Sequence, residues 1–271
     1  MRIFLLLIGA AATVAILVNG HFHWQEKTAL SSFKESSKAS AQVQDEPKKE
    51  AGKEKKGKKS EGTKKLLAYT QKWPEEARYA FRQALDKDKP FKFAIIGSQV
   101  MGDQKSDWPQ KLKKELTSTY GSENIDVQIY EYSMTSEEFI DKARDKDIAA
   151  SKPDMVLYEP FVFNDSKQGL TTQESHRNLE KTIKNFKKTN ENTAFILQPA
   201  HPAINSVYTE QTTRLRLFAQ NRAIPYLDHW TEWQEASGSE IEKYIQPNGT
   251  APNKDGQEIW YDYLESYFIN R

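Results

Sequence analysis

Five short apolar segments alternate with segments of helical periodicity after residue 90, and this alternation constrains the fold more than any other feature of the sequence. The apolar segments cover residues 91–97, 125–132, 154–160, 194–199 and 224–228. Helical periodicity marks residues 75–85, 107–119, 135–150, 172–189, 206–221 and 255–268. Such alternation predicts parallel strands joined by helices that cover both faces of the sheet. We therefore expect residues 66–271 to form one α/β/α domain around a five-stranded parallel sheet.

The residues before this domain predict attachment to a membrane. Residues 1–24 begin with Met1 and Arg2, continue with an apolar run from Ile3 to Val18, and end in an aromatic cluster. The run approaches the ~20 residues that span a bilayer, and no small-residue cleavage site follows it. We expect an uncleaved signal anchor in the cell membrane, with the rest of the chain extracytoplasmic. Secretion after cleavage of a signal peptide is the alternative.

Residues 25–65 differ sharply in composition from the residues on either side. They are rich in lysine and contain almost no large apolar side chain, so they cannot bury enough surface to offset chain entropy. We expect a disordered linker whose lysines can contact anionic polymers of the cell envelope or lipid headgroups. Nucleic acid is not an expected partner, because no aromatic residues interleave with the basic run.

Composition and spacing exclude several kinds of site. The chain has no cysteine, which excludes disulfides, thiolate metal sites and a cysteine nucleophile. Its five histidines include no pair with zinc-ligand spacing, and the Gly97–Gly102 segment lacks the lysine and hydroxyl of a phosphate loop. The sequence therefore predicts neither a metal nor a cofactor.

Polar residues follow the predicted strands, at the edge where ligands bind in parallel α/β sheets. These strand exits carry Ser98, Ser133, Asn164, His201 and His229. A serine, an asparagine and two histidines at one edge suit acyl transfer, in which a base activates a hydroxyl and N–H donors stabilise the oxyanion. Each residue also has an ordinary structural role, such as capping a helix or closing a turn.

Three of these exits resemble the SGNH/GDSL hydrolases, which are serine esterases and deacylases of flavodoxin-like fold. The segment "AIIGSQVMG" matches the family's G-D-S-L-x-x-G block, with Ser98 as nucleophile and Gly97 in place of aspartate. The segment "KPDMVLYEPFVFND" matches the G-x-N-D block, so the resemblance implies that Asn164 contributes to the oxyanion hole with the N–H of Ser98. "YEYSMTSEEF" has no glycine where the family supplies another oxyanion N–H, and Ser133 or Met134 stands there.

The last block departs most from the family pattern. The family has D-x-x-H there, whereas "NGTAPNKDGQEIW" has Asn248 and Ala251 at those two places. A base would then have to come from elsewhere, with His229 the first candidate and His201 the second, because a neutral imidazole suits deprotonation of serine near pH 7. Both histidines also have structural interpretations, as a core residue and a loop stabiliser respectively.

The resemblance implies a hydrolase, and the lysine-rich, cysteine-free, tethered layout is typical of a bacterial envelope protein. Together they predict cleavage of an ester or O-acyl group on a surface carbohydrate or lipid. Two alternatives stay open. One is a catalytically inactive binding or assembly factor, because loss of the base can cost on the order of 10⁴ to 10⁶ in rate. The other is an O-acyltransferase, in which a sugar hydroxyl replaces water.

Overall fold

A computed structural model of the protein describes residues 61–271, apart from 103, 204 and 237; the side chains of residues 234–239 also remain undescribed. The predicted anchor over residues 1–24 and nearly all of the predicted linker lie outside this range. No helix within the described range is both long enough and apolar enough to cross a membrane. The described part starts with a helical segment over residues 61–69, whose Leu66, Leu67 and Tyr69 pack against the core.

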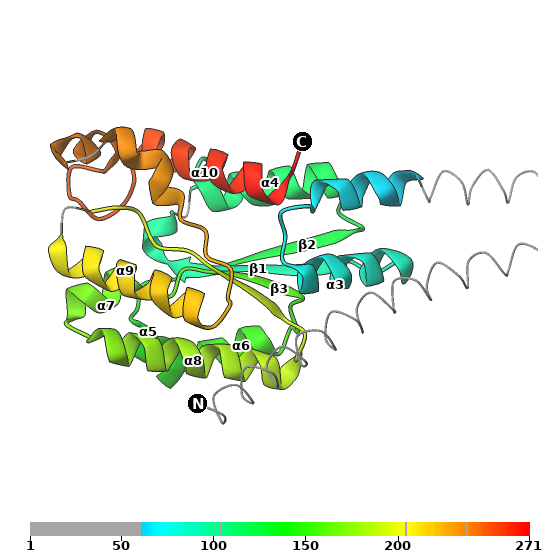
Figure 1. Ribbon diagram of the computed structural model, residues 1–271, viewed down its shortest axis with the longest axis horizontal. Coiled ribbons are helices and arrows are strands. Elements are labelled where there is room, and N and C mark those ends of the chain that lie inside the picture. The colour runs from blue at the N-terminus through cyan, green and yellow to red at the C-terminus, as the bar shows by residue number, and fades with distance from the viewer. Residues whose placement is uncertain (1–60, 103, 204, 237) are drawn as a thin grey trace, which may run out of the picture. The chain divides into compact units, whose positions relative to one another are not determined.

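The centre of the domain is a parallel sheet (Figure 1). Its strands are β1 (Phe91–Ser98), β2 (Ile125–Tyr132), β3 (Met155–Tyr158) and β4 (Ala194–Leu197), in the order β2-β1-β3-β4. The connections from β1 and β3 therefore run to opposite sides of the sheet, and the strand order reverses between these two strands. Ligands in sheets of this kind bind at that point, beyond the carboxyl ends of the strands.

The prediction of a fifth strand over residues 224–228 is only partly met. Tyr226 forms an isolated parallel bridge with Leu197, and the described residues make four strands. The ladder is confined to two hydrogen bonds, from Leu197 N–H to the Pro225 carbonyl and from Leu227 N–H to the Leu197 carbonyl. Pro225 has no N–H to extend the pairing, and β4 itself ends just before Pro199.

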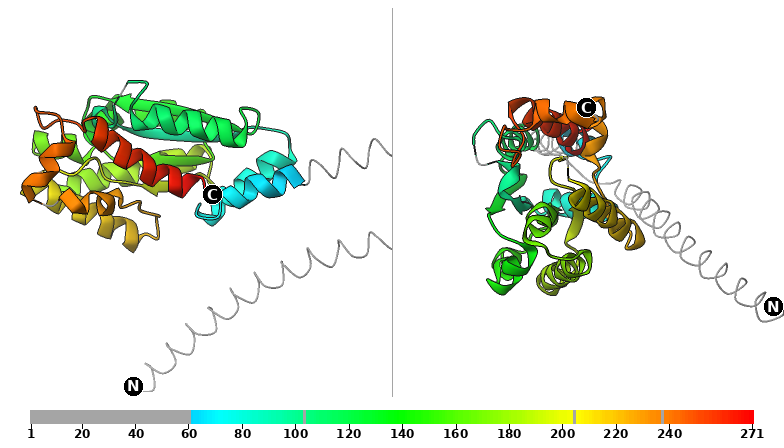
Figure 2. Two further views of the ribbon diagram at one scale, coloured as in Figure 1. Left: turned by 90° about the horizontal axis from the view of Figure 1, so that it is seen from above. Right: turned by 90° about the vertical axis from the view of Figure 1, so that its left-hand side faces the viewer.

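Helices cover both faces of the sheet (Figures 1 and 2). One face packs against α3 (Glu75–Asp86), α4 (Trp108–Tyr120) and α10 (Lys254–Phe268). The other face packs against α5 (Ser136–Asp141), α6 (Arg144–Ala149), α7 (Val162–Gln168), α8 (Thr172–Thr189) and α9 (Ser206–Asn221). Alternate residues of β1 point to the two cores, so Phe93 and Ile95 face one and Ala94 and Ile96 face the other.

Two local features differ from the helices that periodicity predicts. The helix expected over 135–150 is broken into α5 and α6 by Ala143, which has a left-handed φ of 56°. The expected loop around Asn164 is instead the short helix α7, entered through Phe161 with a φ of 62°. Two 3₁₀ segments, His229–Ala236 and Gly238–Tyr244, lead into the final helix.

Candidate active site

Ser98 is the last residue of β1 and precedes the 3₁₀ turn Gln99–Met101. Its backbone is extended, with φ −84° and ψ 167°, and its side chain makes no capping hydrogen bond to that turn. The ordinary role of a serine at this position, capping the following turn, is therefore not what its hydroxyl does. The residue is fully buried, so a substrate could reach it only after neighbouring groups move.

Asn164, in the first turn of α7, lies beside the exits of β1 and β2. Its amide Nδ2 donates to the Gln99 Oε1 at 2.9 Å and to the Met134 carbonyl at 2.8 Å, and its Oδ1 accepts from Gln99 Nε2 at 3.0 Å. The contact with a carbonyl fixes which end of the Asn164 amide is the donor. The fold thus brings together the three segments that carry Ser98, Met134 and Asn164, far apart in sequence.

The groups predicted to form the oxyanion hole are engaged within the protein. The Ser98 N–H donates to the Glu159 Oε2 at 2.7 Å, and the Asn164 amide is held by Gln99 and Met134. Ser133 is exposed, in the bend after β2, next to Met134. Gln99 is itself exposed, so its side chain can leave Asn164 without unfolding its surroundings.

Glu159 is the neighbour of Ser98 that the sequence interpretation missed. It follows β3 directly, and its side chain is fully buried. Desolvation raises its pKa to about 7, although hydrogen bonds from the side chain and backbone of Ser98 oppose the shift. A signal was present in the sequence, because a carboxylate ends the otherwise apolar run "MVLYE".

Gly97 and Glu159 depend on each other sterically. A Cβ at Gly97 would come within 2.9 Å of the Glu159 Cβ, 3.1 Å of its Oε2 and 2.6 Å of the Met101 sulfur. Gly97 stands where the GDSL motif has aspartate, and the side chain of Glu159 occupies the space beside residue 97.

His229 has both ring nitrogens engaged in the core. Trp233 Nε1 donates to its Nδ1 at 3.1 Å, which leaves the proton on Nε2 to donate to the Pro199 carbonyl at 3.0 Å. The ring stacks on Trp260 at 4.3 Å, and burial lowers the pKa of His229 to about 3. The geometry gives no support to His229 as the base and matches the structural alternative.

His201 is also fully buried, in the loop after β4. Its ring lies 5.0 Å from that of Phe163, the residue before Asn164, and its backbone carbonyl accepts from the Tyr208 hydroxyl. Burial lowers its pKa to about 4, against a smaller opposing contribution from the backbone of Gly249. Neither ring nitrogen completes a hydrogen bond of good geometry with the described residues, so His201 stays an untested candidate.

The segment that replaces the family's D-x-x-H is built as a turn. Asn248 Oδ1 accepts from the backbone and hydroxyl of Thr250, and the Ala251 carbonyl accepts from Gln246. The residues that keep the family spacing have structural roles: Asn253 caps α10, and a Cβ at Gly256 would lie 2.3 Å from the Tyr244 carbonyl oxygen. No acid–histidine pair is formed here.

Several buried polar atoms at this edge have no hydrogen-bond partner of good geometry among the described residues. They belong to residues at the exits of β1, β3 and β4: Ser98 Oγ, Glu159 Oε1, Gln198 Nε2 and both ring nitrogens of His201. Buried polar groups are nearly always hydrogen bonded, and five of the nine unpartnered buried side-chain atoms of the described residues gather at this carboxyl edge, which makes the edge a candidate site. No cluster of metal-ligating side chains occurs in the described part of the chain.

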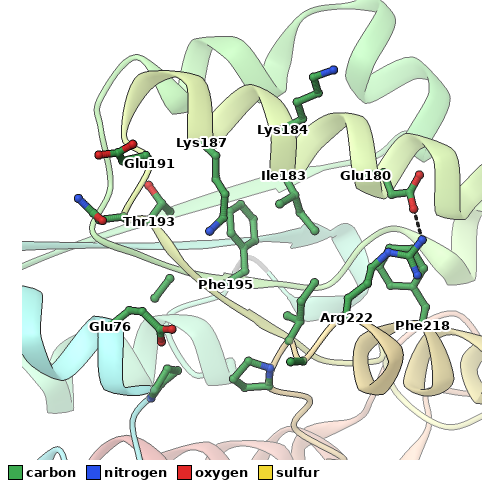
Figure 3. Close-up of a pocket in the computed structure, with 16 residues that line it drawn as sticks. Glu76, Glu180, Ile183, Lys184, Lys187, Glu191, Thr193, Phe195, Phe218 and Arg222 are labelled. Carbon is green, nitrogen blue, oxygen red and sulfur yellow. Dashed lines mark hydrogen bonds and ion pairs between the residues drawn. The ribbon is translucent and has the colours of Figure 1, made fainter. Parts of the chain in front are cut away.

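A surface pocket of about 730 Å³ lies elsewhere, at the amino end of β4 (Figure 3). In its lining, Arg222 pairs with Glu180 and lies 3.8 Å over the ring of Phe218. It begins at Thr193 and Ala194, at the opposite end of the sheet from the Ser98 edge, and contains none of the predicted site residues.

Comparison with solved structures agrees with this fold. The chain is similar to TesA (18% identity, TM-score 0.51, 65% of this chain and 97% of that one). It is also similar to a protein described as a GDSL-like lipase from Parabacteroides merdae (11%, 0.56, 67% and 96%) and to the acetylxylan esterase Axe2 from Geobacillus stearothermophilus (14%, 0.54, 67% and 96%). No family model and no curated protein sequence matches the chain. The described domain therefore has the fold of the GDSL esterases.

Proposed function

We propose that the protein is an extracytoplasmic, membrane-anchored hydrolase that uses Ser98 to cleave an ester or O-acyl group on a cell-envelope carbohydrate or lipid. The observation that carries the proposal is that Asn164 is hydrogen bonded to both Gln99, the residue after Ser98, and Met134, so the segments after β1, β2 and β3 meet at the carboxyl edge of a sheet with the GDSL-esterase fold. The similarity to an acetylxylan esterase favours an acetylated polysaccharide as the substrate class. Residues 1–24 supply the anchor in this proposal.

Catalysis by this site requires the Gln99 side chain to release Asn164. The freed Nδ2 could then donate to the oxyanion as Ser98 attacks the carbonyl carbon. Gating by a movable side chain is compatible with the exposure of Gln99 and the burial of Ser98.

The test is hydrolysis of p-nitrophenyl acetate and of acetylated xylan by the full-length chain in detergent. We expect turnover that Ser98→Ala abolishes and that Asn164→Ala lowers by roughly 10² to 10³. Gln99→Ala should leave activity intact or raise it, because it frees the Asn164 amide. The proposal would be contradicted if the wild type showed no turnover, or if the Ser98→Ala variant turned over the esters as fast as the wild type.

A non-catalytic binding or assembly factor is the second candidate function. Full burial of Ser98 and the engagement of both predicted oxyanion donors favour it. It predicts saturable binding of an acetylated glycan by wild type and Ser98→Ala alike, without release of acetate. O-acyl transfer predicts instead that acetate appears on an added sugar acceptor.

A further inference from the structure

The carboxylate of Glu159 is held against Ser98 by the sheet itself. Ser98 ends β1 and Glu159 follows β3, its hydrogen-bonded neighbour, and the Ser98 N–H donates to the Glu159 Oε2 at 2.7 Å. The lack of a side chain at Gly97 leaves the space that the carboxylate needs. Glu159 therefore cannot move far from Ser98 without breaking a buried, charge-assisted hydrogen bond.

The other side-chain polar atoms of Ser98 and Glu159 include two that lack a hydrogen-bond partner of good geometry among the described residues. The Ser98 hydroxyl and the Glu159 Oε1 are both fully buried, and neither has a hydrogen bond of good geometry within the described chain. Ser98 and Glu159 are still direct neighbours, because the Ser98 N–H donates to the Glu159 Oε2 at 2.7 Å. A change of the Ser98 χ1 rotamer redirects the hydroxyl, and a hydroxyl turned toward Glu159 can donate to the carboxylate.

Burial and one neighbouring acid keep the proton affinity of Glu159 high. Burial raises its pKa most, and Asp165 of α7 adds like-charge repulsion, while hydrogen bonds from Ser98 and from the Phe161 backbone oppose the shift. Burial, and to a smaller extent Glu159, in turn raises the pKa of the Tyr158 and Tyr208 phenols. A carboxylate in these surroundings can accept a proton near neutral pH, as a histidine does in a conventional serine esterase.

We propose that Glu159 is the proton acceptor for the Ser98 hydroxyl, and so replaces the histidine that is missing at Ala251. The inference rests on the hydrolase function proposed above. Ser98 Oγ bonds to the acyl carbon as its proton passes to Glu159; the ester C–O bond then breaks, and the departing alcohol takes that proton. Water next attacks the acyl carbon and gives a proton to Glu159, which returns it to Ser98 Oγ as the acyl group leaves as the acid.

The experiment measures phosphonylation of Ser98 by a fluorophosphonate, in the full-length chain in detergent, by mass spectrometry across neutral pH. This step needs only the activated serine, and fluoride leaves as the proton is taken up. In the wild type we expect the rate to rise with pH and level off above about 7. Glu159→Gln should slow it by roughly 10² to 10⁴ and remove the dependence on pH around 7. Glu159→Asp should retain part of the rate with a shifted pH profile.

Asp145→Asn is the matched control, because Asp145 is also a fully buried acid with one unpartnered oxygen, but lies in α6 and binds Asn185. It should react like the wild type. If Glu159→Gln does not fold, the pH profile of Glu159→Asp decides. A Glu159→Gln rate and pH profile like those of the wild type, or a loss found only in His201→Gln, would overturn the inference while leaving the hydrolase proposal standing.

The proposed function can fail separately. A Glu159-dependent reaction of Ser98 without turnover of any ester would support the proton acceptor and contradict the hydrolase. A Ser98 that never reacts in the wild type would overturn both.

Discussion

Glu159 makes the stability of the protein depend on pH in a characteristic direction. Burial raises its pKa to about 7, above the ordinary 4.5, so the folded state holds a proton that the unfolded state releases between these values. Unfolding free energy should therefore be highest below pH 4.5 on this account and fall as pH rises through 7. At about 1.4 kcal/mol for each pH unit between the two values, the loss approaches roughly 3 kcal/mol.

Glu159→Gln is permanently neutral and should escape this loss. We expect its stability relative to the wild type to increase between about pH 5 and pH 8 by up to roughly 3 kcal/mol, measured by urea denaturation. Glu191→Gln, at an exposed glutamate, serves as the control and should show no such trend. A difference that stays constant with pH would show that the carboxylate is not forced neutral by burial.

His229 should prove to be a structural residue. His229→Ala removes a fully buried ring stacked on Trp260 and hydrogen bonded to Trp233, so we expect a loss of about 3 kcal/mol in unfolding free energy. His176→Ala, at a half-buried helix position, should cost much less. The rate of Ser98 phosphonylation per folded molecule should not change in either variant. A folded His229→Ala that no longer reacts would restore His229 as a candidate base.

At the scale of elements, the break between α5 and α6 should be a source of strain. Ala143 adopts a φ of 56°, where its Cβ is unfavourable, and glycine tolerates this conformation. Ala143→Gly should stabilise the domain by about 0.5–1 kcal/mol in urea denaturation. Ala150→Gly, at a right-handed position that ends α6, is the control and should destabilise. Equal destabilisation by both changes would contradict the assignment of strain to Ala143.

Periodicity predicted most elements because they are long enough to show it. The segments that became β1, β2, α8, α9 and α10 match their expected positions closely. The break at Ala143 and the start of α7 at Phe161 depend on left-handed residues that are not glycine, which leave no compositional signal. The expected fifth strand is a single bridge. A strand needs backbone N–H donors as well as apolar residues, and Pro225 has no N–H.

The sequence points to Ser98 and Asn164 as candidate site residues but not to Glu159, the proposed proton acceptor. Ser98 and Asn164 follow apolar segments and match motifs of the GDSL hydrolases, which makes them candidates from the sequence. His229 was a candidate base because of its residue type, but both of its ring nitrogens are hydrogen bonded in the core. Sequence alone does not single out Glu159, because the residue falls within the expected strand 154–160. Its importance comes from its contact with Ser98 across the β1–β3 pairing, which is a tertiary feature.

At the scale of the whole molecule, the proposed N-terminal anchor predicts where the domain is found. We expect the full-length chain to stay in the membrane fraction after carbonate extraction, because residues 1–24 carry the apolar run. A chain lacking residues 1–24 should be recovered in the aqueous fraction with the same rate of Ser98 phosphonylation. Release of the full-length chain by carbonate would contradict the anchor, whereas recovery of a shortened chain in the medium would favour cleavage and secretion.

The close approach of Glu159 to Gly97 has a consequence for recognising related sequences. The acidic side chain beside Ser98 follows the third strand, and a side chain at residue 97 would crowd it. A search for aspartate immediately before the serine would pass over any chain with this arrangement. A paired pattern, with glycine-serine at the end of one strand and glutamate five residues before asparagine-aspartate after another, would find such chains and distinguish them from chains with aspartate before the serine.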